Sequence, residues 1–88
     1  MERKEEMALS EGAVLQGLKE ILEEVVGIKP GDVESSKDFS NDLDVDSLSM
    51  VEVVVAAEER FGIKIPDEAV SDMKTVGDAV AYIVKAAA

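Results

Sequence analysis

The sequence contains no cysteine and no histidine. Without cysteine it can form neither a disulfide nor a thiolate metal site, which fits a reducing compartment. Without histidine it lacks the side chain that most often acts as a general base near neutral pH. A reactive hydroxyl in this chain therefore has no obvious internal base, and its chemistry must be done to it by another protein.

Long apolar runs are missing as well. No run is long enough to span a bilayer, and the N-terminus has no basic segment followed by an apolar one. These absences predict a cytoplasmic domain with no membrane insertion. A chain of 88 residues forms one small domain with a modest core. We expect it to be a monomer.

Basic residues are few compared with acidic ones, 9 against 20, so the formal net charge is −11. Such a surface disfavours nucleic acid and anionic membranes. It favours partners with basic patches, because opposite fields steer their encounter. Charge could also serve solubility alone. However, the segment from Asp42 to Glu59 contains six acids and no base, and this concentration favours a docking surface.

Apolar periodicity predicts three main helices and one short helix, over residues 11–26, 47–61, 67–71 and 76–85. Gly27 suits a left-handed position after the first helix, Pro30 follows as a stop, and Gly62 ends the second helix. Thr75 and Asp78 match a capping box before the last helix. The fold class is therefore all-α, a small bundle.

The remaining segments complete the predicted organisation. Residues 1–10 form a flexible tail or a frayed start of the first helix, residues 11–85 form the domain, and residues 86–88 fray. The first helix buries one stripe: Val14, Leu18, Ile21, Leu22 and Val25. A long loop over residues 28–45 joins the first two main helices, and loops of this length are usually functional or disordered. Its apolar residues are interpreted as anchors on the helices: Ile28, Val33, Phe39, Leu43 and Val45.

The second helix has two apolar stripes. One contains Met50, Val53, Val54, Ala57 and Phe61. The other, rotated from the first, contains Leu48, Val51 and Val55. Two stripes indicate two contacts, of which the core is one. The second contact is either a partner protein or more core.

Three aspartates before this helix resemble part of a calcium loop. Asp42, Asp44 and Asp46 match the first, third and fifth positions of an EF-hand. The sixth position requires glycine and holds Ser47, and the last requires glutamate and holds Val53. We therefore expect no calcium site, only weak and nonspecific cation binding by the acids.

Ser47 has two interpretations from the residues alone. A nucleophilic serine needs a base and an oxyanion hole, and only Lys37 and Lys64 are basic residues near it in sequence. We therefore expect no catalytic residue and no enzyme activity. Alternatively, Asp46 or Ser47 caps the helix by accepting amide hydrogens of its first turn, worth about 1 kcal/mol.

The wider pattern resembles an acyl carrier protein over residues 14–83, nearly the whole folded part. The matching motifs occur in family order and spacing: Asp46-Ser47-Leu48, Val51-Glu52, Glu58-Glu59, Phe61, Ile65-Pro66-Asp67-Glu68, Thr75-Val76 and Tyr82-Ile83. Peptidyl carrier domains are similar in fold, but they usually have Gly-Gly-His-Ser or a variant at the site. The string from Leu43 to Glu52 most resembles discrete actinobacterial carriers for long-chain fatty acid synthesis.

The resemblance implies that Ser47 is the attachment point for 4′-phosphopantetheine, which a separate phosphopantetheinyl transferase adds from coenzyme A. The terminal thiol of this arm, absent from a cysteine-free chain, would hold acyl groups as thioesters in fatty acid biosynthesis. It also implies that partner enzymes of the synthase dock basic patches on one set of residues: Asp46, Leu48, Val51, Glu52, Val55, Glu58 and Glu59. Many weak contacts suit a shuttle that must leave each enzyme quickly.

Two residues depart from the family pattern, Asp44 and Ser49. Asp44 stands where Gly, Asn or Gln is common, and Asp tolerates a positive φ better than most residues. Ser49 stands where an acid is frequent. Both changes bear on partner choice and leave the serine assignment intact.

Two alternatives to a fatty acid carrier remain from the sequence: a carrier of polyketide or other specialised acyl groups, and an unmodified acidic adaptor that only binds proteins. A further hypothesis concerns the core, which has few aromatic residues and the small residues Ala56, Ala57 and Ala69. A loosely filled bundle could shelter an acyl chain.

Overall fold

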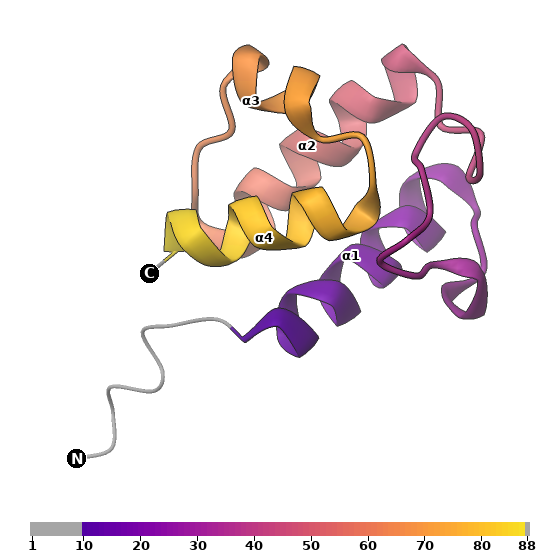
Figure 1. Cartoon of the computed structure of the whole chain (residues 1–88), viewed down its shortest axis with the longest axis horizontal. Coiled ribbons are helices and arrows are strands. Elements are labelled where there is room, and N and C mark those ends of the chain that lie inside the picture. Colours follow the sequence, from indigo (N-terminus) through magenta and orange to yellow (C-terminus); the bar gives the residue numbers. More distant parts are fainter. Residues whose placement is uncertain (1–9, 88) are drawn as a thin grey trace.

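The computed structural model describes residues 10–87 of the chain. Four α-helices follow one another, α1 (Glu11–Val26), α2 (Ser47–Phe61), α3 (Asp67–Asp72) and α4 (Val76–Ala87), with a single 3-10 turn, η2 (Pro30–Asp32), after α1. Figure 1 shows α1, α2 and α4 as the long elements and α3 as a short helix above α4. The predicted all-α bundle with a long loop is confirmed.

The helix ends follow local signals closely. α1 and α2 have the predicted bounds, and Gly27 and Gly62 adopt the left-handed conformation after them, with φ of 78° and 67°. α3 is one residue longer than predicted. We expected Ala86 and Ala87 to fray, but α4 continues through both. The physical reason is that alanine is the best helix former.

Only the last residue of the predicted N-terminal tail can be compared with the structure, because residues 1–9 lie outside the described part. Ser10 is the N-cap of α1, and its hydroxyl accepts a hydrogen bond of 3.0 Å from the N–H of Ala13. It therefore belongs to the first helix and not to the tail. Ala88 also lies outside the described residues.

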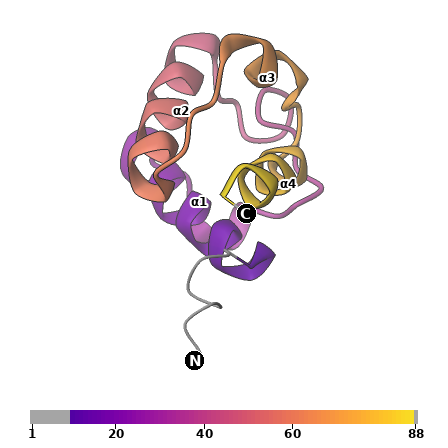
Figure 2. The ribbon, with the colours of Figure 1, turned by 90° about the vertical axis from the view of Figure 1, so that its left-hand side faces the viewer.

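α1 lies against both α2 and α4. Viewed end-on in Figure 2, the four helices surround a common core. Four residues of the predicted stripe of α1 are buried: Val14, Leu18, Ile21 and Leu22. The fifth, Val25, is half-buried at the end of the helix. Each fully buried Val, Leu or Ile side chain stabilises the fold by about 1.5–3 kcal/mol.

Gly17 lets α2 approach α1 closely, and the sequence pattern did not identify it. It is buried on the core side of α1. A Cβ atom at this position would lie 2.6 Å from Cζ of Phe61 and 3.0 Å from Nε of Arg60. A larger residue here would therefore force the side chains of Phe61 and Arg60 to shift.

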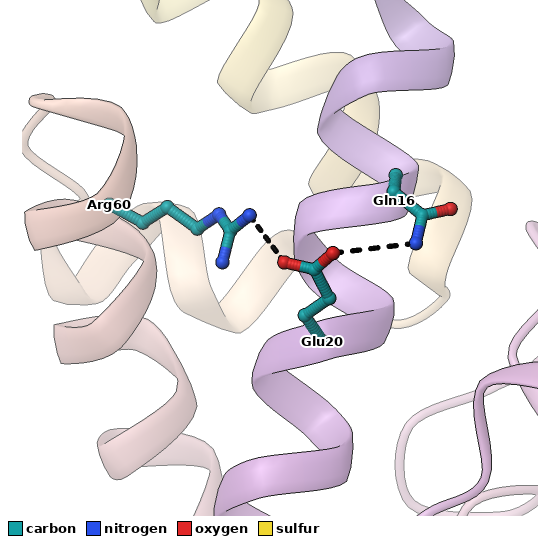
Figure 3. Close-up of polar contacts among 3 residues, drawn as sticks. All are labelled: Gln16, Glu20 and Arg60. Atoms are coloured by element: carbon teal, nitrogen blue, oxygen red, sulfur yellow. Dashed lines mark hydrogen bonds and ion pairs between the residues drawn. The ribbon is translucent and has the colours of Figure 1, made fainter.

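An ion pair joins the same two helices at the surface. The guanidinium of Arg60 donates to the carboxylate of Glu20, which also accepts a 3.5 Å hydrogen bond from the amide of Gln16 (Figure 3). Both charged side chains are nearly half exposed. A pair this exposed contributes about 0–1 kcal/mol.

The long loop is well anchored. Of its five predicted apolar anchors, four are buried: Val33, Phe39, Leu43 and Val45. The fifth, Ile28, is partly buried. The loop also bonds to the chain around the start of α4. The N–H of Phe39 donates to the carbonyl of Lys74 (2.9 Å), and the N–H of Val76 donates to the carbonyl of Lys37 (2.9 Å). These bonds fix the loop before it enters α2.

Among the described helices, none is long and apolar enough to cross a bilayer.

Candidate functional site

Ser47 is the first residue of α2, and its side chain is exposed. The preceding residue, Asp46, is the N-cap: its Oδ1 accepts a hydrogen bond of 2.8 Å from the N–H of Ser49. Of the two capping candidates, the structure selects Asp46. Within residues 10–87 the Ser47 hydroxyl has no hydrogen-bond partner, so it is available to a group outside the chain.

The capping bond also fixes the charge of Asp46. The N–H of Ser49, followed by the hydroxyl of the same residue, holds the pKa of the Asp46 carboxyl below its ordinary value. A carboxylate with a lowered pKa is a weak base. Asp46 therefore stays ionised beside Ser47 and is poorly suited to deprotonate it.

The loop before Asp46 is held by a cluster around Asp38. Its carboxylate accepts hydrogen bonds from the N–H groups of Ser40 (3.2 Å) and Asn41 (3.3 Å). Its own N–H donates to Oδ2 of Asp42 at 2.8 Å. This network closes a tight turn and places Val45 over the core, where its N–H donates to the carbonyl of Phe39 (2.8 Å).

Asp44 adopts a positive φ of 59° and is exposed. Among the described residues it is the only non-glycine residue in this conformation. Aspartate is one of the side chains that tolerate the left-handed region. The substitution relative to the family pattern is therefore compatible with the turn that leads into α2.

The three aspartates of the partial EF-hand pattern have separate structural roles. Asp42 binds the N–H of Asp38, Asp44 occupies the left-handed turn, and Asp46 caps α2. In the described part of the chain, no three acidic, histidine or cysteine side chains are grouped so that they could hold a metal ion.

The second apolar stripe of α2 is exposed to solvent. Leu48, Val51 and Val55 are 72%, 58% and 47% exposed, whereas Val53 and Ala57 on the opposite face are buried. Glu52 and Glu59 are exposed beside this stripe. The stripe therefore forms surface and not additional core.

Glu58 differs from the other acids of α2. It is half-buried, and its Oε2 accepts a 2.7 Å hydrogen bond from the N–H of Ile65. This bond fixes the link between α2 and α3, a role that the sequence pattern did not reveal. Asp46 and Glu59 lie near opposite ends of α2, about 20 Å apart at 1.5 Å per residue, so the predicted site residues form a strip along the helix and not a cluster.

An open pocket of about 430 Å³ lies beside Ser47. Its apolar walls come from three parts of the chain: Phe39 and Val45 of the loop, Met50 of α2, and Met73 after α3. Lys74 also lines it. Sequence reasoning missed Met73 and Lys74 because only the tertiary contact between the loop and the α3–α4 link brings them to this place.

Comparison with known proteins identifies the family of the chain. The model of one family, described as the phosphopantetheine attachment site, matches residues 16–83. An acyl carrier protein of Acidothermus cellulolyticus is 64% identical over 80 residues, which cover 91% of this chain and 95% of that protein. The chain belongs to the acyl carrier protein family. The family predicted from the sequence is confirmed.

Other carriers give the same result. The acyl carrier protein of Thermobifida fusca is 51% identical over 90% of this chain and all of its own length. A meromycolate extension acyl carrier protein of Mycolicibacterium smegmatis is 53% identical over 90% of this chain and 80% of its own. The solved acyl carrier protein of Enterococcus faecalis has a TM-score of 0.74 at 35% identity, covering 89% of this chain and 99% of that one.

Membership of the family settles the broad role. As an acyl carrier protein, the chain holds acyl groups on a 4′-phosphopantetheine arm. It works with the transferase that adds the arm and with synthase enzymes that process the acyl groups. The exposed hydroxyl at the start of α2 lies inside the matched segment.

Proposed function

We propose that Ser47 is the residue to which the arm is attached. Three observations support it: the side chain is exposed at the first position of α2, the cap is provided by Asp46, and a pocket opens beside it. The observation with most weight is the cap, because it leaves the hydroxyl free of the role that a helix-start serine usually has.

The attachment converts the Ser47 hydroxyl into a phosphodiester. The bond from Oγ to phosphorus forms as the pyrophosphate bond of coenzyme A breaks, and adenosine 3′,5′-bisphosphate leaves. The hydroxyl proton passes to a base of the transferase. This division of labour follows from the chain itself, which has no histidine and whose nearest carboxylate, Asp46, has a lowered pKa. The carrier itself is therefore not an enzyme.

Partner enzymes dock, in this proposal, on the exposed strip of α2 with basic patches of their own. The apolar contacts come from Leu48, Val51 and Val55, and the charged contacts from four acids: Asp46, Glu52, Glu58 and Glu59. Glu58 is less accessible to a partner, because it is half-buried and one of its oxygens accepts the N–H of Ile65. The net charge of −11 keeps copies apart and fits a cytoplasmic monomer.

The pathway we infer is fatty acid biosynthesis of long chains. Relatives named for meromycolate extension, 53% and 54% identical to this chain, support it.

The apolar walls of the pocket beside Ser47 also support the sheltering of an acyl chain inside the bundle. Acyl groups of increasing length should then raise the melting temperature progressively. A melting temperature independent of chain length would contradict internal sheltering.

The attachment is tested by intact mass after incubation with coenzyme A, magnesium and a broad-specificity phosphopantetheinyl transferase. The wild type should gain the mass of one phosphopantetheine. Ser47→Ala should gain none, and Ser49→Ala, two residues further along the same helix, serves as the matched control and should still be modified. Modification of Ser47→Ala would overturn the assignment, and an unmodified wild type would favour the adaptor.

A further inference from the structure

A single basic side chain lines the pocket beside Ser47. Within the described residues, Lys74 is the only lysine or arginine on this pocket, whose other charged residues are Asp38 and Asp46. It comes from the link between α3 and α4, which descends beside the loop that enters α2 (Figure 1). A cation therefore faces the same space as the Ser47 hydroxyl.

The backbone of Lys74 is held by two hydrogen bonds beside this pocket. Its carbonyl accepts the N–H of Phe39 at 2.9 Å, and its N–H donates to Oδ2 of Asp78 at 3.1 Å. The residue is exposed, and in the part of the chain that the structure describes its ammonium makes no ion pair. Its backbone position is thus fixed by the fold, and its ammonium is close enough to Asp78 to help the N–H groups of Thr75 and Lys74 lower the pKa of that carboxyl.

Attachment of the arm to Ser47 would place a negatively charged phosphodiester next to other negative charges. The phosphodiester adds a negative charge next to the ionised Asp46, in a segment with six acids and no base between Asp42 and Glu59. Like charges this close repel each other, and a nearby cation offsets the repulsion. The fold provides such a cation on the opposite side of the pocket.

Four other basic residues of the described part are placed elsewhere. Arg60 is paired with Glu20 on the far end of α2 (Figure 3). Lys64 lines a separate pocket at that same end. Lys29 and Lys37 line a third one at the beginning of the loop. By position, Lys74 is the base suited to a group on Ser47.

We propose that the ammonium of Lys74 binds the phosphate of the arm attached to Ser47. This inference rests on the proposed attachment at Ser47. The pairing directs the first part of the arm over the pocket, toward its apolar walls at Met50 and Met73. Both charges are exposed, so the contact is weak and screened by salt. It orients the arm and still allows partner enzymes to draw it out.

The test is phosphorus NMR of the modified protein, in wild type, Lys74→Gln, Lys74→Arg and the control Lys64→Gln. At low salt the phosphodiester signal of Lys74→Gln should be displaced from that of the wild type. Lys64→Gln and Lys74→Arg should keep the wild-type position. Raising the salt from roughly 0.01 M to 1 M should move the wild-type signal toward that of Lys74→Gln, since the Debye length falls from about 30 to 3 Å.

The possible results separate the two claims. Equal low-salt signals in wild type and Lys74→Gln would overturn the role of Lys74, and would leave it as a solvated surface charge. A wild-type protein without any phosphodiester signal would instead overturn the attachment itself. The unfolding free energy of the unmodified Lys74→Gln protein should equal that of the wild type, which excludes a merely structural effect.

Discussion

The starts of α2 and α4 are both capped by side-chain oxygens that accept backbone N–H groups, but only at α4 is a hydroxyl group one of the acceptors. At α4 the Thr75 hydroxyl accepts the N–H of Asp78 at 3.1 Å, and the Asp78 carboxylate accepts the N–H groups of Lys74 and Thr75, each at 3.1 Å. Both side chains are thus committed to the cap. At α2 the carboxylate of Asp46 caps alone, and the neighbouring Ser47 hydroxyl is spared.

The second residues of the two helices also differ in how far they are covered by the rest of the protein. The second residue of α4, Gly77, lies against the loop, and its N–H donates to the carbonyl of Ser35 at 2.9 Å. The second residue of α2, Leu48, is 72% exposed. The comparison teaches that one helix start is built into the fold and the other is presented to partners.

The largest expected effect comes from substituting these two second positions. A Cβ atom at Gly77 would lie 3.0 Å from the carbonyl oxygen of Ser35, which is backbone. Gly77→Val should therefore lower the unfolding free energy by about 1–3 kcal/mol. Leu48→Ala should change it by less than about 0.5 kcal/mol. Urea unfolding measures both, and equal losses would remove the difference between the two helix starts.

A smaller effect is expected from removing the hydroxyl at α4. Thr75→Ala deletes the acceptor for the N–H of Asp78 and should cost about 1 kcal/mol of unfolding free energy. Thr75→Ser keeps the hydroxyl and should recover most of that loss. If serine and alanine were equally destabilising, the hydroxyl would not be the source of the stability.

The stability that Asp78 contributes through the α4 cap should decrease modestly as the pH is lowered. The N–H of Thr75, followed by that of Lys74, holds the pKa of Asp78 below its ordinary value. The stability from this group is therefore fully present above the unfolded pKa and is lost as the pH falls through the folded one. The stability difference between wild type and Asp78→Asn should shrink in acid.

The control for that series is Asp72→Asn, which removes the same charge from the exposed end of α3. Asp72 makes none of the hydrogen bonds of the α4 cap, so this variant changes the net charge and keeps the cap. Parallel curves for the two variants, measured by urea unfolding at each pH, would show that net charge and not the cap governs the pH dependence.

Local sequence signals were sufficient for most of the fold. Glycine after a periodic apolar run gave the ends of α1 and α2, and the Thr75–Asp78 box gave the start of α4, because caps depend on residues within one turn. The buried stripe of α1 and the existence of two stripes on α2 also followed from helical periodicity, but periodicity left open whether the second stripe was surface or core. The family resemblance supplied the reason to single out Ser47.

Features that depend on tertiary contact could not be predicted in this way. Gly17 lies directly against the ring of Phe61, and Glu58 accepts a hydrogen bond from the N–H of Ile65 because the α2–α3 link folds back. Neither contact lies within a helical repeat. The pocket beside Ser47, with Lys74 on its rim, likewise combines three segments that are distant in sequence.

The central claim, that Asp46 caps α2 and leaves the Ser47 hydroxyl free, is tested most directly by the stability of unmodified Ser47→Ala. We predict that its unfolding free energy equals that of the wild type within about 0.5 kcal/mol, while Thr75→Ala in the same experiment loses about 1 kcal/mol. A loss in Ser47→Ala as large as that in Thr75→Ala would show that the serine hydroxyl is itself a cap, and would contradict the account.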